Sequence, residues 1–471
     1  MEAIIRRCAG LDVHKKSITV CVSVLEEHGK PNSEVRTFAT MTRHLETLRD
    51  WLLDRQVTHV AMESTGVLWK PVFNILEDHF TILLCNARHI KAVPGRKTDV
   101  KDAEWIAQLL QHGLLTGSFI PPRAQRDLRD LTRHRAQLTD EKARQVNRIH
   151  KILEDANIKF GAVATDIMGV SGRDMLRALI AGSADAGQMA DLARRRMRGK
   201  IPELREALHG RVTEHHRYML GLHLRHVEQL EEMIAELDKR IGLLMSEGKL
   251  DSDEATPMSD AQQNPSEASP MENSSCEPRQ NPSETSLMEN SSSDSTANTP
   301  GAQVQPPLPF AEAVELLDEM PGIDVVSAVE ILAEIGTNMK QFPDGKHLAS
   351  WACICPGNEE SAGKHKSGKT GKGNRWLSRV LCQAAWAASH TKDTYLAAQY
   401  RRLAKTRGKK RAIIAVGHSM LIAIYHMLAY RKHYNELGAK FFDQLDPERI
   451  TRYHVKRLES LGFAVTLEKA A

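Results

Sequence analysis

The spacing of apolar residues divides the 471-residue chain into an α/β segment followed by helical segments. In residues 1–122, short apolar or alternating runs predict strands, and apolar residues at helical spacing predict helices between them. The predicted strands are Cys8–Val13, Ser17–Val24, Val35–Thr40, His59–Ser64 and Thr81–Asn86, and the predicted helices are Arg43–Arg55, Val67–Glu77 and Asp99–Leu115. We therefore expect an α/β domain over residues 1–122.

Residues 123–246 have an entirely helical pattern. Near its end, apolar residues repeat every seven positions, with a second row three residues later, at Leu220, Val227, Ile234 and Ile241 and at Leu230, Leu237 and Leu244. Such a repeat is typical of a coiled-coil seam, and we expect it to serve self-association. A helical hairpin within one chain is the alternative that the pattern leaves open.

Residues 247–307 have the composition of a disordered linker. They are rich in Ser, Pro, Asn, Glu and Gln, and they contain two near-copies, QNPSEASPMENSS and QNPSETSLMENSS. Because so few of these residues are apolar, the segment cannot bury enough surface to offset the loss of chain entropy. We expect it only to span the distance between the folded segments on its two sides.

Residues 308–471 are predicted to form a helical C-terminal domain. There Pro321-Gly322-Ile323 separates two helical patterns, which indicates a helix-hairpin-helix turn. At such a turn Gly322 would let backbone N–H groups approach a phosphate of a nucleic acid, helped by the following helix N-terminus. An ordinary helical hairpin is the alternative.

The formal net charge of +4 hides a strong asymmetry along the chain. Residues 251–300 contain ten Asp or Glu and one Arg, whereas residues 361–411 contain fourteen Lys or Arg and the single acid Asp393. So dense a basic stretch is expected of a surface that follows a phosphate backbone, although a solvated helix face can have the same composition.

The sequence also indicates a cellular compartment. It has no apolar run typical of a membrane span and no signal-peptide pattern, so we expect a cytoplasmic protein with no membrane partner. The seven cysteines include no CxxC pair, which predicts reduced thiols.

Four acidic residues are spaced for metal-dependent chemistry on a phosphodiester. Asp12 ends the first predicted strand and Glu63 the fourth, while Asp99 and Asp102 are three residues apart on one face of a predicted helix. Two hard cations about 4 Å apart need several converging carboxylates. Two hairpin-like strands, a third strand and then alternating helices and strands is the order of an RNase H/RuvC-like sheet. Together these features predict a site for divalent metal, with two Mg²⁺ ions expected.

A second chemical candidate is the glycine- and lysine-rich stretch WACICPGNEESAGKHKSGKTGKGNRWLSRVL at 351–381. A serine in such a loop can present its hydroxyl to a phosphate while nearby cations offset the developing charge. Composition alone favours a simpler phosphate-binding loop, in which the serines only donate hydrogen bonds.

Five motifs closely resemble the IS110 family of insertion-sequence transposases, also called bridge-RNA-guided recombinases. In chain order they are GLDVHK, AMESTG, KTDVKDAEW, MPGIDVVSAVEILAEIG and PGNEESAGK…KGNRWL. The resemblance covers both folded ends and the helical middle of the chain, and it leaves the linker outside. It implies a RuvC-like domain whose DEDD carboxylate set falls on Asp12, Glu63, Asp99 and Asp102. It also implies a C-terminal transposase domain whose nucleophilic serine falls on Ser361.

The serine motif departs from the family pattern in two places. The family often has Ser-Gly at the nucleophile, whereas Ala362 follows Ser361 here, and a second serine precedes glycine at Ser367. The spacing from Ser361 to Asn374 is near the usual spacing in the family, and it favours Ser361. In addition, Ser378 stands where the family commonly has an arginine.

The resemblance further implies the partners and the cellular setting. It implies a bacterial, nucleoid-associated enzyme that binds the DNA of the element ends and target, together with a structured non-coding guide RNA whose base pairing carries specificity. It implies a homo-oligomer, dimer to tetramer, in which the RuvC-like domain of one subunit meets the serine domain of another. We expect nucleic-acid contacts at Gly322, Lys364, Lys366, Lys369, Lys372, Asn374 and Arg375.

Two other functions stay open at this point. One is a metal-dependent, RuvC-like, structure-specific DNA nuclease without a covalent serine intermediate. The other is a non-catalytic protein that binds nucleic acid for architecture.

Overall fold

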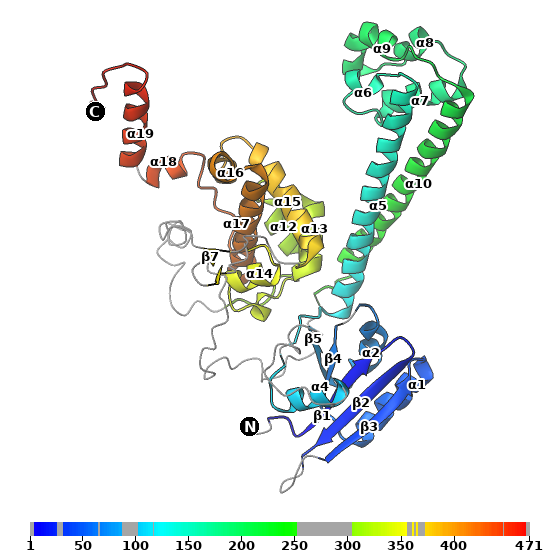
Figure 1. The fold of residues 1–471 in the computed structure, drawn as a ribbon, viewed down its shortest axis with the longest axis vertical. Coiled ribbons are helices and arrows are strands. Elements are labelled where there is room, and N and C mark those ends of the chain that lie inside the picture. Colours follow the sequence, from blue (N-terminus) through cyan, green and yellow to red (C-terminus); the bar gives the residue numbers. More distant parts are fainter. Residues whose placement is uncertain are drawn as a thin grey trace. The chain divides into compact units, whose positions relative to one another are not determined.

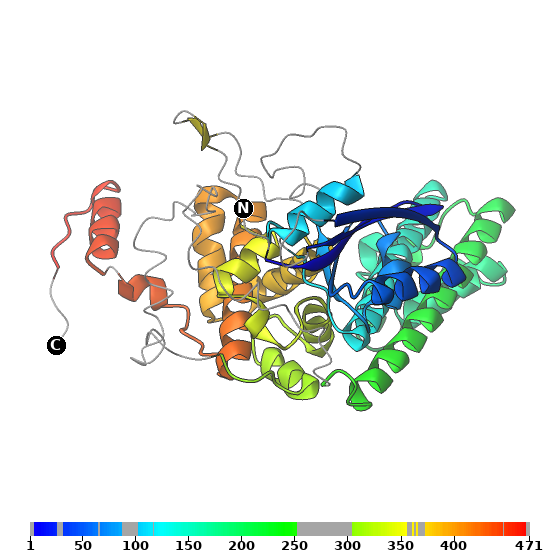
Figure 2. The same ribbon diagram turned by 90° about the horizontal axis from the view of Figure 1, so that it is seen from below.

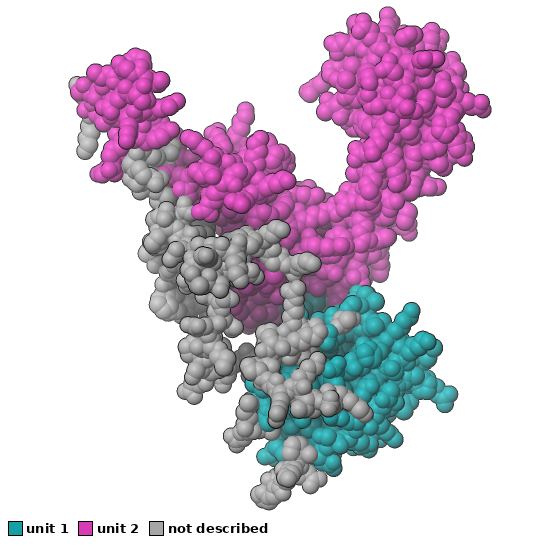
Figure 3. Space-filling view, in the orientation of Figure 1, with its two compact units in different colours: residues 1–123, 252–277 teal, residues 124–251, 278–471 magenta. Residues whose placement is uncertain are grey.

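The computed structural model describes residues 4–25, 32–64, 66–86, 102–115, 117–251, 304–355, 360–361, 364–365, 373–445 and 447–467. The chain forms two compact units, shown in Figure 3. The first contains the described residues up to Arg123, and the second contains those from Ala124 onward.

The first unit is a five-stranded mixed sheet with helices on both faces. Its strands are β1 (Arg7–Val13), β2 (Ser17–Val24), β3 (Asn32–Ala39), β4 (His59–Glu63) and β5 (Thr81–Cys85), in the order β3-β2-β1-β4-β5. The pairs β1–β2 and β2–β3 are antiparallel, whereas β4 is parallel to both β1 and β5. The predicted α/β domain and its five strands are confirmed.

Alternation along the strands explains how the helices cover the sheet. Ala9 and Leu11 of β1 pack in one cluster with Leu48 of helix α1 (Thr42–Asp54) and Leu76 of helix α2 (Trp69–Leu76). Cys8 faces the other way and packs with helix α4 (Asp102–Gln111). Successive side chains of a strand point to opposite faces, so the even-numbered residues of β1 face α4.

The second unit begins with a long antiparallel helical hairpin made by α5 (Arg123–Asp155) and α10 (Glu214–Ser246). The two helices lie side by side in Figures 1 and 2. Polar contacts run along their length, with Arg135 Nε 2.5 Å from Asp238 Oδ1 and Lys142 Nζ 3.2 Å from Glu231 Oε1. The heptad pattern therefore faces a helix of its own chain, which favours the helical hairpin over a seam for self-association.

A small helical head closes the far end of this hairpin. It comprises α6 (Phe160–Val163), α7 (Val170–Ala181), α8 (Ala186–Asp191), the 3₁₀ helix η1 (Arg195–Lys200) and α9 (Ile201–Ala207), which share a buried core with the adjoining parts of α5 and α10. Arg195, Arg196 and Arg198 of η1, called here the head arginines, are exposed, and none pairs with an acidic side chain in the part of the chain that the structure describes.

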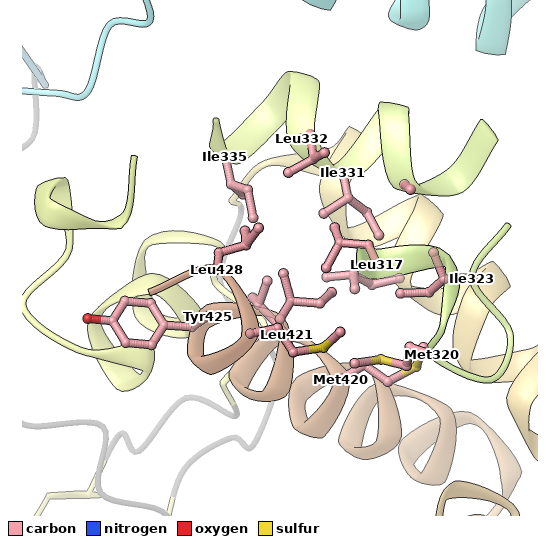
Figure 4. Packing of buried hydrophobic residues seen from close by; sticks show 14 of the residues in the cluster. Leu317, Met320, Ile323, Ile331, Leu332, Ile335, Met420, Leu421, Tyr425 and Leu428 are labelled. Atoms are coloured by element: carbon pink, nitrogen blue, oxygen red, sulfur yellow. The ribbon is translucent and has the colours of Figure 1, made fainter. Parts of the chain in front are cut away.

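The C-terminal part of the second unit is a helical bundle around α17 (Lys409–Tyr430). Its other helices are α12 (Phe310–Asp318), α13 (Val325–Ile335), η3 (Met339–Gln341), α14 (Gly345–Trp351), α15 (Arg375–His390) and α16 (Tyr395–Arg407), followed by α18 (Phe441–Leu445) and α19 (Pro447–Glu459). Figure 4 shows Leu317 of α12, Ile331 of α13 and Leu421 of α17 meeting in the core. Leu128 of α5 and Ile241 of α10 belong to the same core, so the base of the hairpin and the bundle are packed together.

Helix α17 is the one helix in the described ranges that is long and apolar enough to cross a membrane. Its apolar window is 61% buried inside the protein, because it is the central helix of the bundle core. The six cysteines in the described part are free thiols, as predicted.

Both ends of the segment predicted as a linker, residues 247–307, are packed on the second unit. Asp251 Oδ1 accepts a hydrogen bond from Phe310 N at 2.6 Å, and Leu250 and Val304 both pack against the bundle core. Residues 252–303 lie outside the described ranges. The described residues on both sides of this gap belong to one core, and the role of the segment between them stays a prediction.

Candidate active site

Two of the predicted carboxylates lie at adjacent strand ends. Leu11 of β1 is paired with Met62 of the parallel strand β4, so the next residues, Asp12 and Glu63, end neighbouring strands at the same edge. Ala61 of β4 packs against α4. By the same alternation, Asp12 and Glu63 both face the side of the sheet that α4 covers.

Gly10 lets α4 lie directly on β1. A Cβ atom at Gly10 would lie 2.3 Å from the carbonyl oxygen of Ala103 and 2.4 Å from the backbone nitrogen of Ala107. Only a residue without a side chain permits so close an approach of helix and strand. This contact brings Asp102, the first residue of α4, toward the strand end that holds Asp12.

The pKa of the Asp12 carboxyl responds to the two other acids. Burial raises it above its ordinary value, and the negative charges of Asp102 and Glu63 raise it further, while His14 lowers it. The His14 Nε2 atom lies 3.1 Å from Asp12 Oδ2. The net shift is upward, because burial and like charges both disfavour the ionised form.

These carboxylates suit a hard divalent cation, which prefers oxygen ligands and would relieve their mutual repulsion. In the described ranges, no group of three or more His, Cys, Asp or Glu side chains is arranged to hold a metal ion. Asp99, the fourth predicted ligand, lies outside the described residues. The donor types suit a metal, and Asp12, Glu63 and Asp102 stay predicted ligands, although their side chains in the described ranges are not arranged as a complete site.

The sequence interpretation did not include the contact between His14 and Asp12. The two residues are two apart at the end of a strand, and such residues share a face of the sheet. The hairpin turn then carries His14 back over the carboxylate, with His14 N donating to Ser17 O at 2.9 Å. Period-two spacing was the signal that could have revealed this contact.

The predicted nucleophile lies in a short β-hairpin of β6 (Glu360–Ser361) and β7 (Lys364–His365). In this hairpin Ser361 is paired with Lys364 and Glu360 with His365. Three of the predicted nucleic-acid contacts, Lys366, Lys369 and Lys372, lie outside the described ranges.

Asn374 and Arg375 begin α15, directly after this region. The Asn374 Oδ1 atom accepts hydrogen bonds from the backbone nitrogens of Trp376 and Leu377, and its Nδ2 atom donates to Glu334 Oε2 at 2.6 Å. Arg375 is exposed, and its guanidinium carbon lies 4.4 Å from the ring centre of Trp376. The Asn374 side chain is thus engaged within the protein, whereas Arg375 is open to a ligand.

Gly322 lies in the turn between α12 and α13, as predicted. It has a positive φ of 90°, and a Cβ atom there would lie 2.3 Å from the carbonyl oxygen of Ala384 in α15. The following helix is capped by Asp324, whose Oδ1 accepts from Ser327 N at 2.8 Å. Close packing on α15 is therefore sufficient to require glycine at this position. Phosphate binding there stays a prediction.

Comparison with known protein families gives two matches. A model for DEDD transposases of the IS110 type, described as Transposase, matches residues 9–158. A second model, described as Transposase IS116/IS110/IS902 family, matches residues 314–401. The first range contains all four predicted carboxylates, and the second contains Ser361. No curated protein matches the chain significantly. The two matches lie in the same order as the two chemical centres, and the chain belongs to the IS110 family of transposases, enzymes that act on DNA.

Proposed function

We propose that this transposase breaks and rejoins DNA with Ser361 as the nucleophile and with divalent metal held by Asp12, Glu63, Asp99 and Asp102. The observation that carries the proposal is the convergence of Asp12, Glu63 and Asp102 at one edge of the sheet, where their charges raise the pKa of Asp12. The strand order β3-β2-β1-β4-β5, antiparallel and then parallel, supports an RNase H/RuvC-like interpretation of this unit.

The carboxylate residues prepare the site for a phosphate. Mg²⁺, expected as two ions, would polarise the phosphate oxygens when bound. His14 contacts Asp12 Oδ2 and so restricts how that carboxylate can turn. Gly10 fixes the distance between β1 and α4 and thereby the separation of Asp12 and Asp102.

The serine step is a transesterification. Ser361 Oγ forms a bond to phosphorus, the bond from phosphorus to the leaving deoxyribose oxygen breaks, and the serine proton ends on that oxygen. In the second step a sugar hydroxyl of the partner strand attacks the phosphoserine, and Ser361 regains a proton. The number of phosphoester bonds is unchanged, so neither water nor a nucleoside triphosphate is consumed. Residues 363–370, GKHKSGKT, match the GxxxxGK[ST] pattern of a phosphate-binding loop, but the balanced transesterification proposed here consumes no nucleotide.

We further propose that a structured guide RNA selects the DNA sequence and that the enzyme acts as an oligomer. The dense basic charge of residues 361–411 supports contact with phosphate backbones, of which Arg375 is an exposed example. Sequencing the RNA that co-purifies with the protein tests this part. RNA that is unrelated to the element's own flanking sequence would contradict RNA guidance.

Substituting Ser361 tests the catalytic part of the proposal. We expect Ser361→Ala to bind DNA as the wild type does, but to neither cleave nor join strands, because no phosphoserine can form. Ser367→Ala is the matched control, since it removes a hydroxyl from the same basic stretch, and it should keep both activities. Cleavage by Ser361→Ala at the wild-type rate would favour a metal-dependent nuclease instead.

A further inference from the structure

A buried polar cluster joins helices α5 and α13 to the start of α15. The Glu334 side chain in α13 is 2% exposed, and its two oxygens accept from Arg133 Nε at 2.7 Å and Arg133 Nη2 at 2.8 Å. Arg129 Nε lies 3.3 Å from Glu334 Oε2, and Asn374 Nδ2 donates to the same oxygen. A carboxylate buried this deeply is held in one orientation by the donors around it, because a buried charge that is less completely compensated costs free energy.

Asn374 ties this cluster to the start of α15. Its Oδ1 atom caps the helix and its Nδ2 atom binds Glu334, so the side chain bridges α15 and α13. The preceding residue is fixed as well, because a Cβ atom at Gly373 would lie 2.4 Å from the carbonyl oxygen of Ala352. Residues 352–353 and 373–374 are therefore in contact, and they bracket the stretch that contains Ser361.

We propose that Glu334 and Asn374 are positioning residues, which hold the base of the serine-bearing stretch so that Ser361 is presented to DNA in one orientation. The proposal rests on the role of Ser361 proposed above. Arg133 extends the arrangement to α5, since its guanidinium group orients the Glu334 carboxylate. The geometry assigns the asparagine side chain to this internal bond rather than to direct contact with nucleic acid.

The test separates positioning from ordinary stabilisation. Asn374→Ser keeps a good helix N-cap but is too short to reach Glu334, so it removes the bridge alone. Thr394→Ala is the matched control, because it removes the buried N-cap of α16, where Thr394 Oγ1 accepts from Ala397 N at 3.3 Å. Both variants are compared with the wild type as full-length protein with its co-purified RNA, on a DNA duplex that spans the element's own end.

Three quantities are measured: the rate of covalent protein–DNA adduct formation at saturating DNA, the Kd for DNA, and Tm. We expect Asn374→Ser to lower the adduct rate about tenfold or more with an unchanged Kd, because misplacing a nucleophile by a fraction of an ångström is costly. Thr394→Ala should lower Tm by at least as much as Asn374→Ser does, but it should leave the adduct rate near that of the wild type.

Three results would overturn the inference. An adduct rate in Asn374→Ser equal to that of the wild type would make the cluster purely structural. Adduct rates that fall in proportion to Tm in both Asn374→Ser and Thr394→Ala would do the same. Absence of any adduct in the wild type would overturn the proposed nucleophile and this inference with it. If the wild type forms the adduct and Ser361→Ala does not, the proposed role of Ser361 stands. An unchanged adduct rate in Asn374→Ser then contradicts the positioning role alone.

Discussion

Replacing residues 252–303 with a short flexible connection should leave the enzyme active and slightly more stable. The flanking residues already meet, since Asp251 Oδ1 accepts from Phe310 N at 2.6 Å and Gln305 N donates to Ala429 O at 2.9 Å. The segment therefore begins and ends on one packed core, and its length should not set the distance between working parts.

The size of the effect follows from loop-closure entropy. Val304 is six residues before Phe310, so a fully extended chain places it at most about 20 Å from that helix start. A connector of about twelve Gly and Ser residues has a root-mean-square reach of roughly 20 Å, which is sufficient. Because the connection becomes about fourfold shorter, the closure cost falls by about 1 kcal/mol.

The assay compares Tm and strand joining for the shortened and full-length proteins. We expect Tm to rise by about 2–4 °C and joining to stay near the wild-type rate. Asp251→Ala, with the full segment present, is the matched control and should lower Tm, because Phe310 N loses its acceptor. Loss of joining in the shortened protein without loss of Tm would refute the reasoning, since the segment would then supply reach or a binding function.

Three further predictions follow from particular contacts. Gly322→Ala should destabilise the second unit by about 2 kcal/mol or more in chemical denaturation, because its φ is positive and a Cβ would meet the α15 backbone, whereas Gly199→Ala, with no atom nearby, should change little. Burial raises the pKa of Glu231, but hydrogen bonds from Arg173 and Lys142 lower it more, so its folded-state pKa lies below the ordinary value. Its stabilisation is therefore present at neutral pH and lost as pH falls through the folded pKa. Glu231→Gln should lower the free energy of unfolding by about 1 kcal/mol at pH 7, and the difference from the wild type should shrink below pH ~4, in urea titrations at both pH values. A difference that grows on acidification would contradict this. Replacing the three head arginines with glutamine should reduce the salt dependence of nucleic-acid binding, lowering the slope of log K against log salt by about 2–3 if each contacts a phosphate. An unchanged slope would show that the head makes no backbone contact.

The sheet could be predicted from the sequence because its signal is local. Short, largely buried apolar runs set the bounds of β1, β2, β4 and β5 to within a residue or so. Strand β3 begins at Asn32, before the predicted Val35, because the added residues are polar and exposed. An edge strand is held by backbone hydrogen bonds to one neighbour, and these leave no apolar pattern to read.

The partner of the heptad helix could not be predicted from its spacing. Periodicity shows which face is apolar but not which helix covers it. Ile234 and Leu237 are only partly buried, and ion pairs such as Arg135–Asp238 hold that part of the hairpin. Contacts of this kind depend on charged residues far apart in the sequence, which no repeat reveals.

The candidate site was predictable to different degrees in its two halves. Asp12 and Glu63 follow from strand ends and Asp102 from its spacing on a predicted helix, and the structure brings Asp102 and Glu63 within electrostatic reach of Asp12. The bond between Glu334 and Asn374 joins residues forty positions apart in the sequence, which belong to elements with separate local patterns. Sequence spacing therefore predicts the carboxylate arrangement, but it does not predict the hydrogen bond between Glu334 and Asn374.

The central claim, that Ser361 is the residue that becomes joined to DNA, has one direct test. The full-length enzyme, with its co-purified RNA, is incubated with Mg²⁺ and element-end DNA, denatured, and digested with nuclease and protease. Mass spectrometry of the peptide that contains residues 360–365 should then show a nucleotide phosphate on Ser361. Strand joining without any covalent adduct, or an adduct on another residue, would contradict the account.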